Sequence, residues 1–164
     1  MRCTGRVWKY GDNVDTDALY PGQYLVYFDP EEVGKHALEG LDPEFSTKIA
    51  QGDILVAGVN FGCGSAREQA ARTLKYAGIS MVIADSFCRT FFRNAIAIGL
   101  KVIEYSEATK VFNEGDCLDA EVDKGTIYNL TTGIKVQTPV MPELLLTMLK
   151  GGGALNYYKV KISD

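Results

Sequence analysis

Residues 53–68 read DILVAGVNFGCGSARE, and this stretch decides the predicted fold. Its first part, Asp53 to Val59, is a continuous apolar run of the kind that forms a strand buried on both faces of a sheet. A helical pattern begins at Ala66 and runs to Ala77. The glycines between strand and helix let the main chain turn tightly and let another molecule approach it. Because a helix start presents free N–H groups and a positive dipole, this turn is a ready site for an anion such as a carboxylate.

The chain beyond this turn repeats the alternation of strand and helix. Ile79–Ala84 and 101–103 are two further apolar strands, and the helix between them is expected to be capped by Ser86 and ended by Gly99. This order predicts a parallel βαβαβ unit.

The last third of the sequence changes character. Three segments at 118–122, 126–130 and 134–138 alternate apolar and polar residues, which predicts an antiparallel meander. Pro142 is expected to start a last helix through Leu149. The three glycines after it are expected to end that helix and to leave the C-terminal tail without regular structure.

The first fifty residues carry weaker signals. A short opening strand is expected over Gly5–Trp8, and Tyr24–Phe28 could be a strand or a loop. Asp29 is expected to cap a helix in a capping box with Glu32, and Gly40 to end it. A second short turn or helix follows through Ile49.

Composition bounds the class of protein. A chain of 164 residues fits a single domain, residues 1–164. Its net charge of −4 argues against a nucleic-acid surface. We expect no membrane span, since no apolar run is long enough, and a cytoplasmic location, since the first residues lack the apolar core of a signal peptide. The four cysteines form no Cys-x-x-Cys pair, so we expect free thiols and no metal site in this chain.

Three common motifs are excluded at the central turn. It lacks the lysine of a phosphate-binding loop, the third glycine of a dinucleotide fold and the spacing of a hydrolase elbow. The sole histidine, His36, is expected at the surface or flank of its helix, which leaves no base for a serine nucleophile. Ser65 and Glu68 read as a capping box. A serine beside Arg67 in the positive field of a helix start could also abstract a proton next to a carboxylate that the arginine binds.

The run from Gly11 to Asp17 has the alternating acidic residues of a calcium loop but does not complete the pattern. Such a loop would need glycine at position 18 and glutamate at 24, where this chain has Ala18 and Tyr24. The run is therefore interpreted as an Asx-rich turn, or as a turn that holds the carboxylate of Asp17 at the mouth of a site.

Three segments together carry a resemblance to a known family: GDNVDTDALYPGQYLVY (11–27), NFGCGSAREQA (60–70) and IADSFCRTFFRNAIAIGL (83–100). In this order they resemble the small subunits of the 3-isopropylmalate dehydratases, the detached swivel domains of the aconitase superfamily. The resemblance implies a three-layer swivelling β/β/α fold and a hydro-lyase of leucine biosynthesis that acts on a small 2-hydroxy-dicarboxylate. It also implies a heterodimer or heterotetramer with a large subunit that carries a [4Fe-4S] cluster as Lewis acid.

The resemblance assigns roles to several residues of the central turn. Ser65 matches the catalytic base, Asp17 the aspartate that supports it, and Arg67 the arginine that binds a substrate carboxylate. Gly64 and Ala66 belong to the same substrate-binding turn.

Two further groups of residues follow from the resemblance. Tyr24, Leu25, Val26 and Tyr27 match the loop that separates substrates, and valine at 26 suits an apolar branch such as isopropyl. An arginine there would accompany an additional carboxylate. The third segment contributes residues that are structural or support the site: Arg89, Arg93 and Asn94.

One departure leaves the substrate open. The family usually has serine where this chain has Ala66, and losing that hydroxyl should weaken one substrate contact by about 1 kcal/mol. Homoaconitase-like, citramalate and dimethylmalate dehydratases remain alternatives. A different class, a stand-alone module that binds a carboxylate or phosphate, also remains. Cys63, near the helix start, is a candidate for a reactive thiol.

Overall fold

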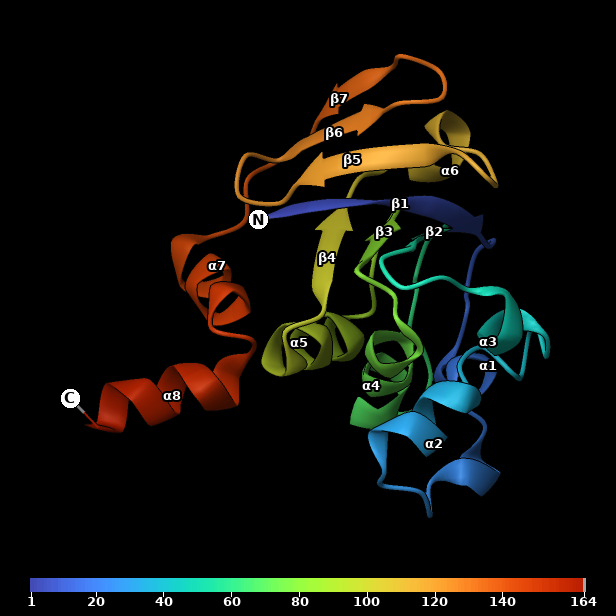
Figure 1. The fold of residues 1–164 in the computed structure, drawn as a ribbon, viewed down its shortest axis with the longest axis vertical. Coiled ribbons are helices and arrows are strands. Elements are labelled where there is room, and N and C mark those ends of the chain that lie inside the picture. Colours follow the sequence, from blue (N-terminus) through green and yellow to red (C-terminus); the bar gives the residue numbers. More distant parts are fainter. Residues whose placement is uncertain (164) are drawn as a thin grey trace.

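The computed structural model describes residues 1–163 and contains a seven-stranded mixed sheet in the order β4-β3-β2-β1-β5-β6-β7 (Figure 1). The strands are β1 Arg2–Lys9, β2 Ile54–Ala57, β3 Met81–Ala84, β4 Lys101–Glu104, β5 Cys117–Glu121, β6 Thr126–Asn129 and β7 Lys135–Gln137. The helices are α1 Thr16–Leu19, α2 Pro30–Lys35, α3 Phe45–Lys48, α4 Glu68–Ala77, α5 Arg89–Ile98, α6 Ala108–Val111, α7 Glu143–Lys150 and α8 Ala154–Ser163.

Strand β1 joins two halves of the sheet. It runs parallel to β2, with Val7 opposite Ile54, and antiparallel to β5, with Arg2 opposite Glu121. β2, β3 and β4 continue the parallel half, and β5, β6 and β7 form the antiparallel half. The strands of the two halves cross at a steep angle, so the sheet curls, and α4 and α5 lie on the side away from β5–β7 (Figure 1). The predicted parallel core, antiparallel meander and three-layer β/β/α class are confirmed.

The core lies between the parallel strands and their helices. Every residue of β2 and β3 is fully buried, as the continuous apolar runs predicted. Helix α4 buries Ala70, Ala71 and Leu74, and it ends at Gly78, whose φ of 112° few other residues adopt. Helices α4 and α5 follow β2 and β3 and so hold the loops at the carboxyl ends of these strands in place.

Several predicted elements differ in extent. The opening strand is longer than Gly5–Trp8, because its first half pairs with β5. Asp29 caps α2 as predicted, accepting hydrogen bonds from the N–H groups of Glu31 and Glu32 at 3.0 and 3.2 Å. The helix ends at Lys35 and not at Gly40, because the chain then turns so that the Leu38 N–H donates to Leu19 O at 2.8 Å.

Of the two alternatives predicted for Tyr24–Phe28, the structure shows the loop, which follows a short 3-10 turn at Gly22–Tyr24. Two other predictions for local structure were wrong. Helix α5 begins at Arg89, because Ser86 Oγ accepts from the Asn60 N–H and does not cap it. The three glycines after α7 do not free the tail, since α8 follows and packs on α5 and α7. A Cβ at Gly153 would lie 2.4 Å from Ala97 O, so glycine permits this close approach.

No helix within residues 1–163 is long and apolar enough to cross a membrane.

Candidate active site

Two loops that are far apart in the sequence lie side by side at the candidate site. The Gly62 N–H donates to Val14 O at 2.8 Å, and the Thr16 N–H donates to Cys63 O at 2.8 Å. The Asx-rich turn before α1 is therefore bonded to the glycine turn that leads into α4. This pairing brings Asp17 into the region of Ser65 and Arg67, as the predicted site requires.

Glycine is required at two positions of the central turn. Gly62 has φ +76°, and a Cβ there would lie 2.2 Å from Cγ of Phe91 on α5. Gly64 has φ +92°, and its Cβ would lie 3.2 Å from Thr16 Oγ1. The turn is therefore packed against α5 on one side and against α1 on the other, which fixes its position.

Ser65 does not cap α4, contrary to the predicted capping box. The helix begins at Glu68, with Arg67 extended at the cap position and making no side-chain cap bond. The Arg67 N–H instead donates to Ser65 O at 2.7 Å, and Glu68 bonds Arg72 at 2.6 Å. A tight turn therefore places Ser65 two residues before the cap, with an exposed side chain. Its hydroxyl is accessible to a substrate but is not held at the first helical N–H groups.

Arg67 forms an ion pair with Asp17, across 50 residues of sequence. The pair joins Nη1 to the carboxylate; Arg67 is 24% exposed and Asp17 is 62% exposed. Gly22 lies beside both, since its Cβ would be 3.6 Å from Arg67 Nη1 and Nη2 and 3.7 Å from Asp17 Oδ1. A guanidinium has five N–H donors, so one bond to Asp17 orients the fork and leaves capacity for a substrate carboxylate.

The two aspartates on either side of Thr16 have different partners. Asp15 caps α1 by accepting from the Ala18 N–H at 2.7 Å, which leaves Asp17 to face Arg67. Between them, Thr16 is 2% exposed, and its Oγ1 has no hydrogen-bond partner among the described residues. Thr16 was not among the predicted site residues, although its place between two aspartates was a usable signal. A buried hydroxyl without a partner is costly, which makes Thr16 a candidate to bond a ligand.

The predicted specificity loop follows Gly22. Tyr24 and Leu25 are half-buried, whereas Tyr27 is 40% and Val26 70% exposed. Tyr24 and Tyr27 both stack near His36. His36, expected at the surface or flank of its helix, is half-buried and contacts the loop, a relation that local spacing does not reveal.

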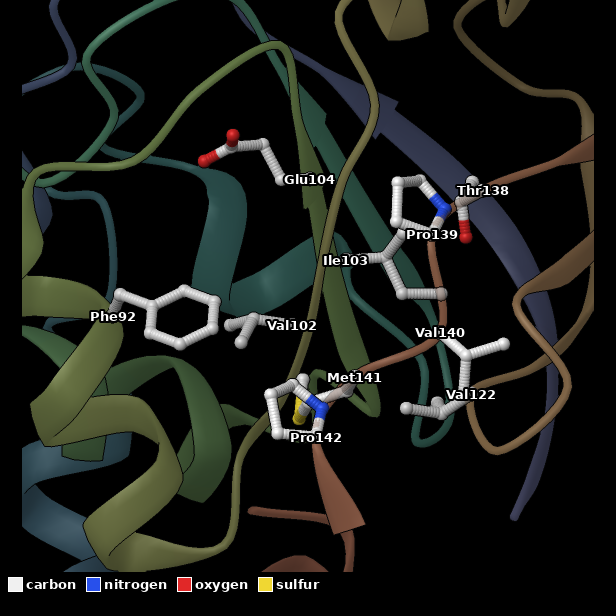
Figure 2. Close-up of a pocket in the computed structure, with 10 residues that line it drawn as sticks. All are labelled: Phe92, Val102, Ile103, Glu104, Val122, Thr138, Pro139, Val140, Met141 and Pro142. Carbon is white, nitrogen blue, oxygen red and sulfur yellow. The ribbon is translucent and has the colours of Figure 1, made fainter. Parts of the chain in front are cut away.

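Arg89, Arg93 and Asn94 lie on α5. The two arginines line a cavity of about 480 Å³ with Phe87, Phe92 and Glu104, and Asp17, Ser65 and Arg67 have no part in its wall. Figure 2 shows the adjoining apolar cavity of about 220 Å³ between β4, Phe92 and residues 138–142, which also lacks the candidate residues. These arginines are therefore candidates for support or for surface contacts.

The positions of the four cysteines in the fold decide whether they could form a metal or iron–sulfur site. Within residues 1–163, no three His, Cys, Asp or Glu side chains are grouped so that they could hold a metal ion. Cys3 is buried and its thiol faces Ser80 O at 3.9 Å, so it is not available to the others. Burial, together with the charge of Asp15, raises the pKa of the Cys63 thiol, which disfavours the reactive thiolate. Among the described residues, the cysteines are therefore not arranged to hold an iron–sulfur cluster.

Comparison with known proteins places the chain in a class. Residues 18–108, which include the glycine turn with Ser65 and Arg67 and begin directly after Asp17, match the aconitase C-terminal domain. The chain therefore belongs to the aconitase superfamily, as one of its C-terminal, or swivel, domains.

Its relatives within that class are small subunits of 3-isopropylmalate dehydratase. The chain is 50% identical over 160 residues to the isopropylmalate/citramalate isomerase small subunit of Methanocaldococcus jannaschii, covering 98% of this chain and 95% of the relative. It is 46% identical to the 3-isopropylmalate dehydratase small subunit of Heliobacterium modesticaldum, covering 100% and 99%. The crystal structure of 3-isopropylmalate dehydratase from M. jannaschii superposes with a TM-score of 0.93 at 42% identity, covering 98% and 95%.

Proposed function

We propose that this chain is the small subunit of a 3-isopropylmalate dehydratase, a hydro-lyase that interconverts 2- and 3-isopropylmalate in leucine biosynthesis. The observation that carries the proposal is the ion pair between Arg67 and Asp17 beside the exposed Ser65. It presents a carboxylate clamp and a hydroxyl on an open surface. The relatives named as small subunits of 3-isopropylmalate dehydratase and of isopropylmalate/citramalate isomerase support the same assignment.

In the proposed mechanism each residue of the turn has a separate task. Arg67 binds one substrate carboxylate through its N–H fork. Ser65, as its alkoxide, removes the proton from the carbon next to that carboxylate; the C–H electron pair forms the double bond, and the hydroxyl of the adjacent carbon leaves as hydroxide on the side of the large subunit. Rehydration returns the proton and a hydroxide to the two carbons in exchanged positions. Asp17, which contacts the guanidinium in this structure, holds Arg67 in place. Gly64 and Ala66 line the turn; both are exposed, so the substrate can lie against them.

We propose that the other half of the site belongs to a large subunit. The relatives are named small subunits, which implies such a partner. The [4Fe-4S] cluster of the reaction is assigned to that partner, in a heterodimer or heterotetramer, since the cysteines here do not fit one. A cytoplasmic location is proposed because the four thiols are free, as in a reducing compartment.

The predicted specificity loop, Tyr24–Tyr27, suits a substrate with an apolar branch. Val26 is 70% exposed in the isolated chain, so it has surface available to contact an isopropyl group. Citramalate is a second candidate substrate, because the M. jannaschii relative is named for both.

The experiment is reconstitution of this chain with a large subunit of an isopropylmalate dehydratase. We expect turnover of 3-isopropylmalate by the pair and none by the chain alone. Ser65→Ala should lower kcat by about 10²–10⁴-fold while the complex still forms in size-exclusion chromatography. Ser106→Ala, at another exposed serine, is the matched control and should retain activity. Full activity of Ser65→Ala would exclude the serine as base, whereas tight carboxylate or phosphate binding by the isolated chain in calorimetry would favour a stand-alone module.

A further inference from the structure

The only histidine of the sequence lies in an aromatic cluster with two tyrosines of the loop Tyr24–Tyr27. His36, at the carboxyl end of α2, stacks on Tyr24 with ring centroids 3.7 Å apart and planes 10° apart. Tyr27 lies 5.7 Å from the same histidine ring, with planes 9° apart. Both tyrosines belong to the loop, so His36 is a contact between that loop and the body of the protein.

One carboxylate ties the stacked rings together. Glu39 accepts a hydrogen bond from the Tyr24 hydroxyl at one oxygen, and its other oxygen lies 2.5 Å from His36 Nδ1. Burial alone would raise the pKa of Glu39, but the hydrogen bonds from Tyr24 and His36 outweigh it and lower the pKa. The carboxylate is therefore ionised at neutral pH, and both of its oxygens are used. Two stacked rings that share one carboxylate have little freedom to slide or tilt.

The loop backbone is held by its own hydrogen bonds and by one from the buried Tyr20, whose hydroxyl donates to Tyr24 O at 2.7 Å. The N–H groups of Tyr24, Leu25 and Tyr27 donate to carbonyls within residues 21–24, at 3.0 to 3.2 Å. Val26 and Phe28 are 70% and 81% exposed and add little packing. The contacts of Tyr24 and Tyr27 with His36 and Glu39 are therefore the ones that set the position of the loop relative to α2.

The other end of the loop touches the carboxylate clamp. Gly22, two residues before Tyr24, lies against the guanidinium of Arg67 and the carboxylate of Asp17. The 3-10 turn Gly22–Tyr24 joins these two contacts directly. A shift of Tyr24 is thus transmitted to the clamp on one side and to Val26 on the other.

We propose that His36 and Glu39 are positioning residues, which set the distance between the Arg67 clamp and Val26 and so help to select the substrate. This inference rests on the proposed function, because it assumes that the loop and Arg67 contact the same substrate. Neither residue touches the reacting atoms. Their effect is expected in substrate binding and selectivity and not in the chemical step.

The test compares four variants. His36→Ala removes the stack and the hydrogen bond, His36→Phe keeps a stacking ring, and Glu39→Gln keeps the shape without the charge. Lys35→Ala, next to His36 on α2 and 53% exposed, is the matched control. KM and kcat are measured for 3-isopropylmalate and citramalate with the reconstituted pair. Chymotrypsin, which cuts after aromatic residues, is applied to the isolated chain to measure exposure of the bonds that follow Tyr24, Tyr27 and Phe28.

We expect His36→Ala to raise KM for 3-isopropylmalate about tenfold, as loss of an aromatic pair allows, with kcat within about twofold of wild type. Its loop should be cut several-fold faster. His36→Phe and Glu39→Gln should give smaller changes in the same direction, and Lys35→Ala should match wild type. Unchanged KM, selectivity and cleavage in His36→Ala would overturn the inference; if that variant does not fold, the same results for His36→Phe and Glu39→Gln overturn it.

The outcomes separate this inference from the proposed function. If the wild-type pair turns over none of the hydroxy-dicarboxylates, the proposed function fails and the substrate-selection role fails with it. The cleavage assay still reports whether His36 and Glu39 hold the loop. If the wild-type pair is active but the His36 and Glu39 variants behave as Lys35→Ala does, the function stands and the positioning role is excluded.

Discussion

Replacing Gly62 by alanine tests whether the packing of the central turn defines the site. Gly62 has φ +76°, a left-handed conformation that costs a residue with a side chain about 1–2 kcal/mol. A Cβ there would lie 2.2 Å from Cγ of Phe91, a side chain that is 2% exposed and has little room to move. Overpacking of this kind costs about 1–3 kcal/mol. We therefore expect Gly62→Ala to lower the free energy of unfolding by about 2–5 kcal/mol.

Gly133 offers a matched control for the overlap. It has φ +78°, close to that of Gly62, but a Cβ at Gly133 would have no atom within 4 Å. Gly133→Ala should therefore cost only the conformational part, about 1–2 kcal/mol. The difference between the two variants, about 1–3 kcal/mol, isolates the contact with Phe91.

Urea unfolding followed by fluorescence of Trp8 measures both variants. Trp8 is the only tryptophan, is 8% exposed and bonds Asp53 at 2.8 Å, so its emission should report global unfolding. Gly62→Ala should also reduce activity in the reconstituted enzyme, because the Gly62 N–H joins the turn to Val14 O. Equal losses of stability in the two variants would refute the reasoning that the turn is wedged against α5.

Three further outcomes are expected. Val26→Arg should shift the ratio of kcat/KM by about tenfold or more toward substrates with an additional carboxylate; an unchanged ratio would remove the loop from substrate selection. Thr16→Val removes the buried hydroxyl that has no partner among the described residues, so thermal stability should hold or rise by about 1 kcal/mol while kcat/KM falls about tenfold; a large loss of stability would show that the hydroxyl has a structural bond. Burial and Asp42 raise the pKa of Tyr10, and the hydrogen bond to Glu39 raises the pKa of Tyr24. Both protonated tyrosines therefore stabilise the folded state below pH 10, and this stability is lost as the pH rises through their pKa values in the folded protein. Ultraviolet titration should show all nine tyrosines ionising near pH 10 in urea but fewer than nine in the native protein. Identical titration curves in the two conditions would contradict this.

Hydrophobic patterning predicted the parts of the fold that the core dictates. β2, β3 and the antiparallel strands were predicted because burial on one or both faces leaves a periodic signature. The wrong predictions fall where a single contact decides the outcome. The Arg67 N–H bonds Ser65 O and displaces the helix start, and packing of α8 against α5 and α7 outweighs the glycines that precede it. Such contacts are tertiary and have no period in the sequence.

The candidate site was predictable by residue type but not by pairing. An arginine and a serine after a buried strand indicated carboxylate chemistry, and the family resemblance supplied Asp17 and the loop. Asp17 bonds Arg67 because the loops after β1 and β2, two paired strands, lie together. His36 stacks on Tyr24 through the folding of the connection between these strands. A lone histidine on a short helix carries no local signal of this role. The assigned roles of Ser65 and Arg67 stay predictions until the variants are assayed.

The position of β1 in the sheet has a consequence for how the chain is built. Its second half pairs with β2, so Val7 and Ile54 can meet once about a third of the chain has left the ribosome. Its first half pairs with β5, and Arg2 cannot meet Glu121 until almost three-quarters of the chain has been made. During synthesis, the edge of β1 that β5 will cover therefore waits unpaired, and such edges invite association with other chains. A slow stretch of translation between residues 60 and 120 would lengthen that exposure, so the order of the sheet links the speed of synthesis to the risk of aggregation.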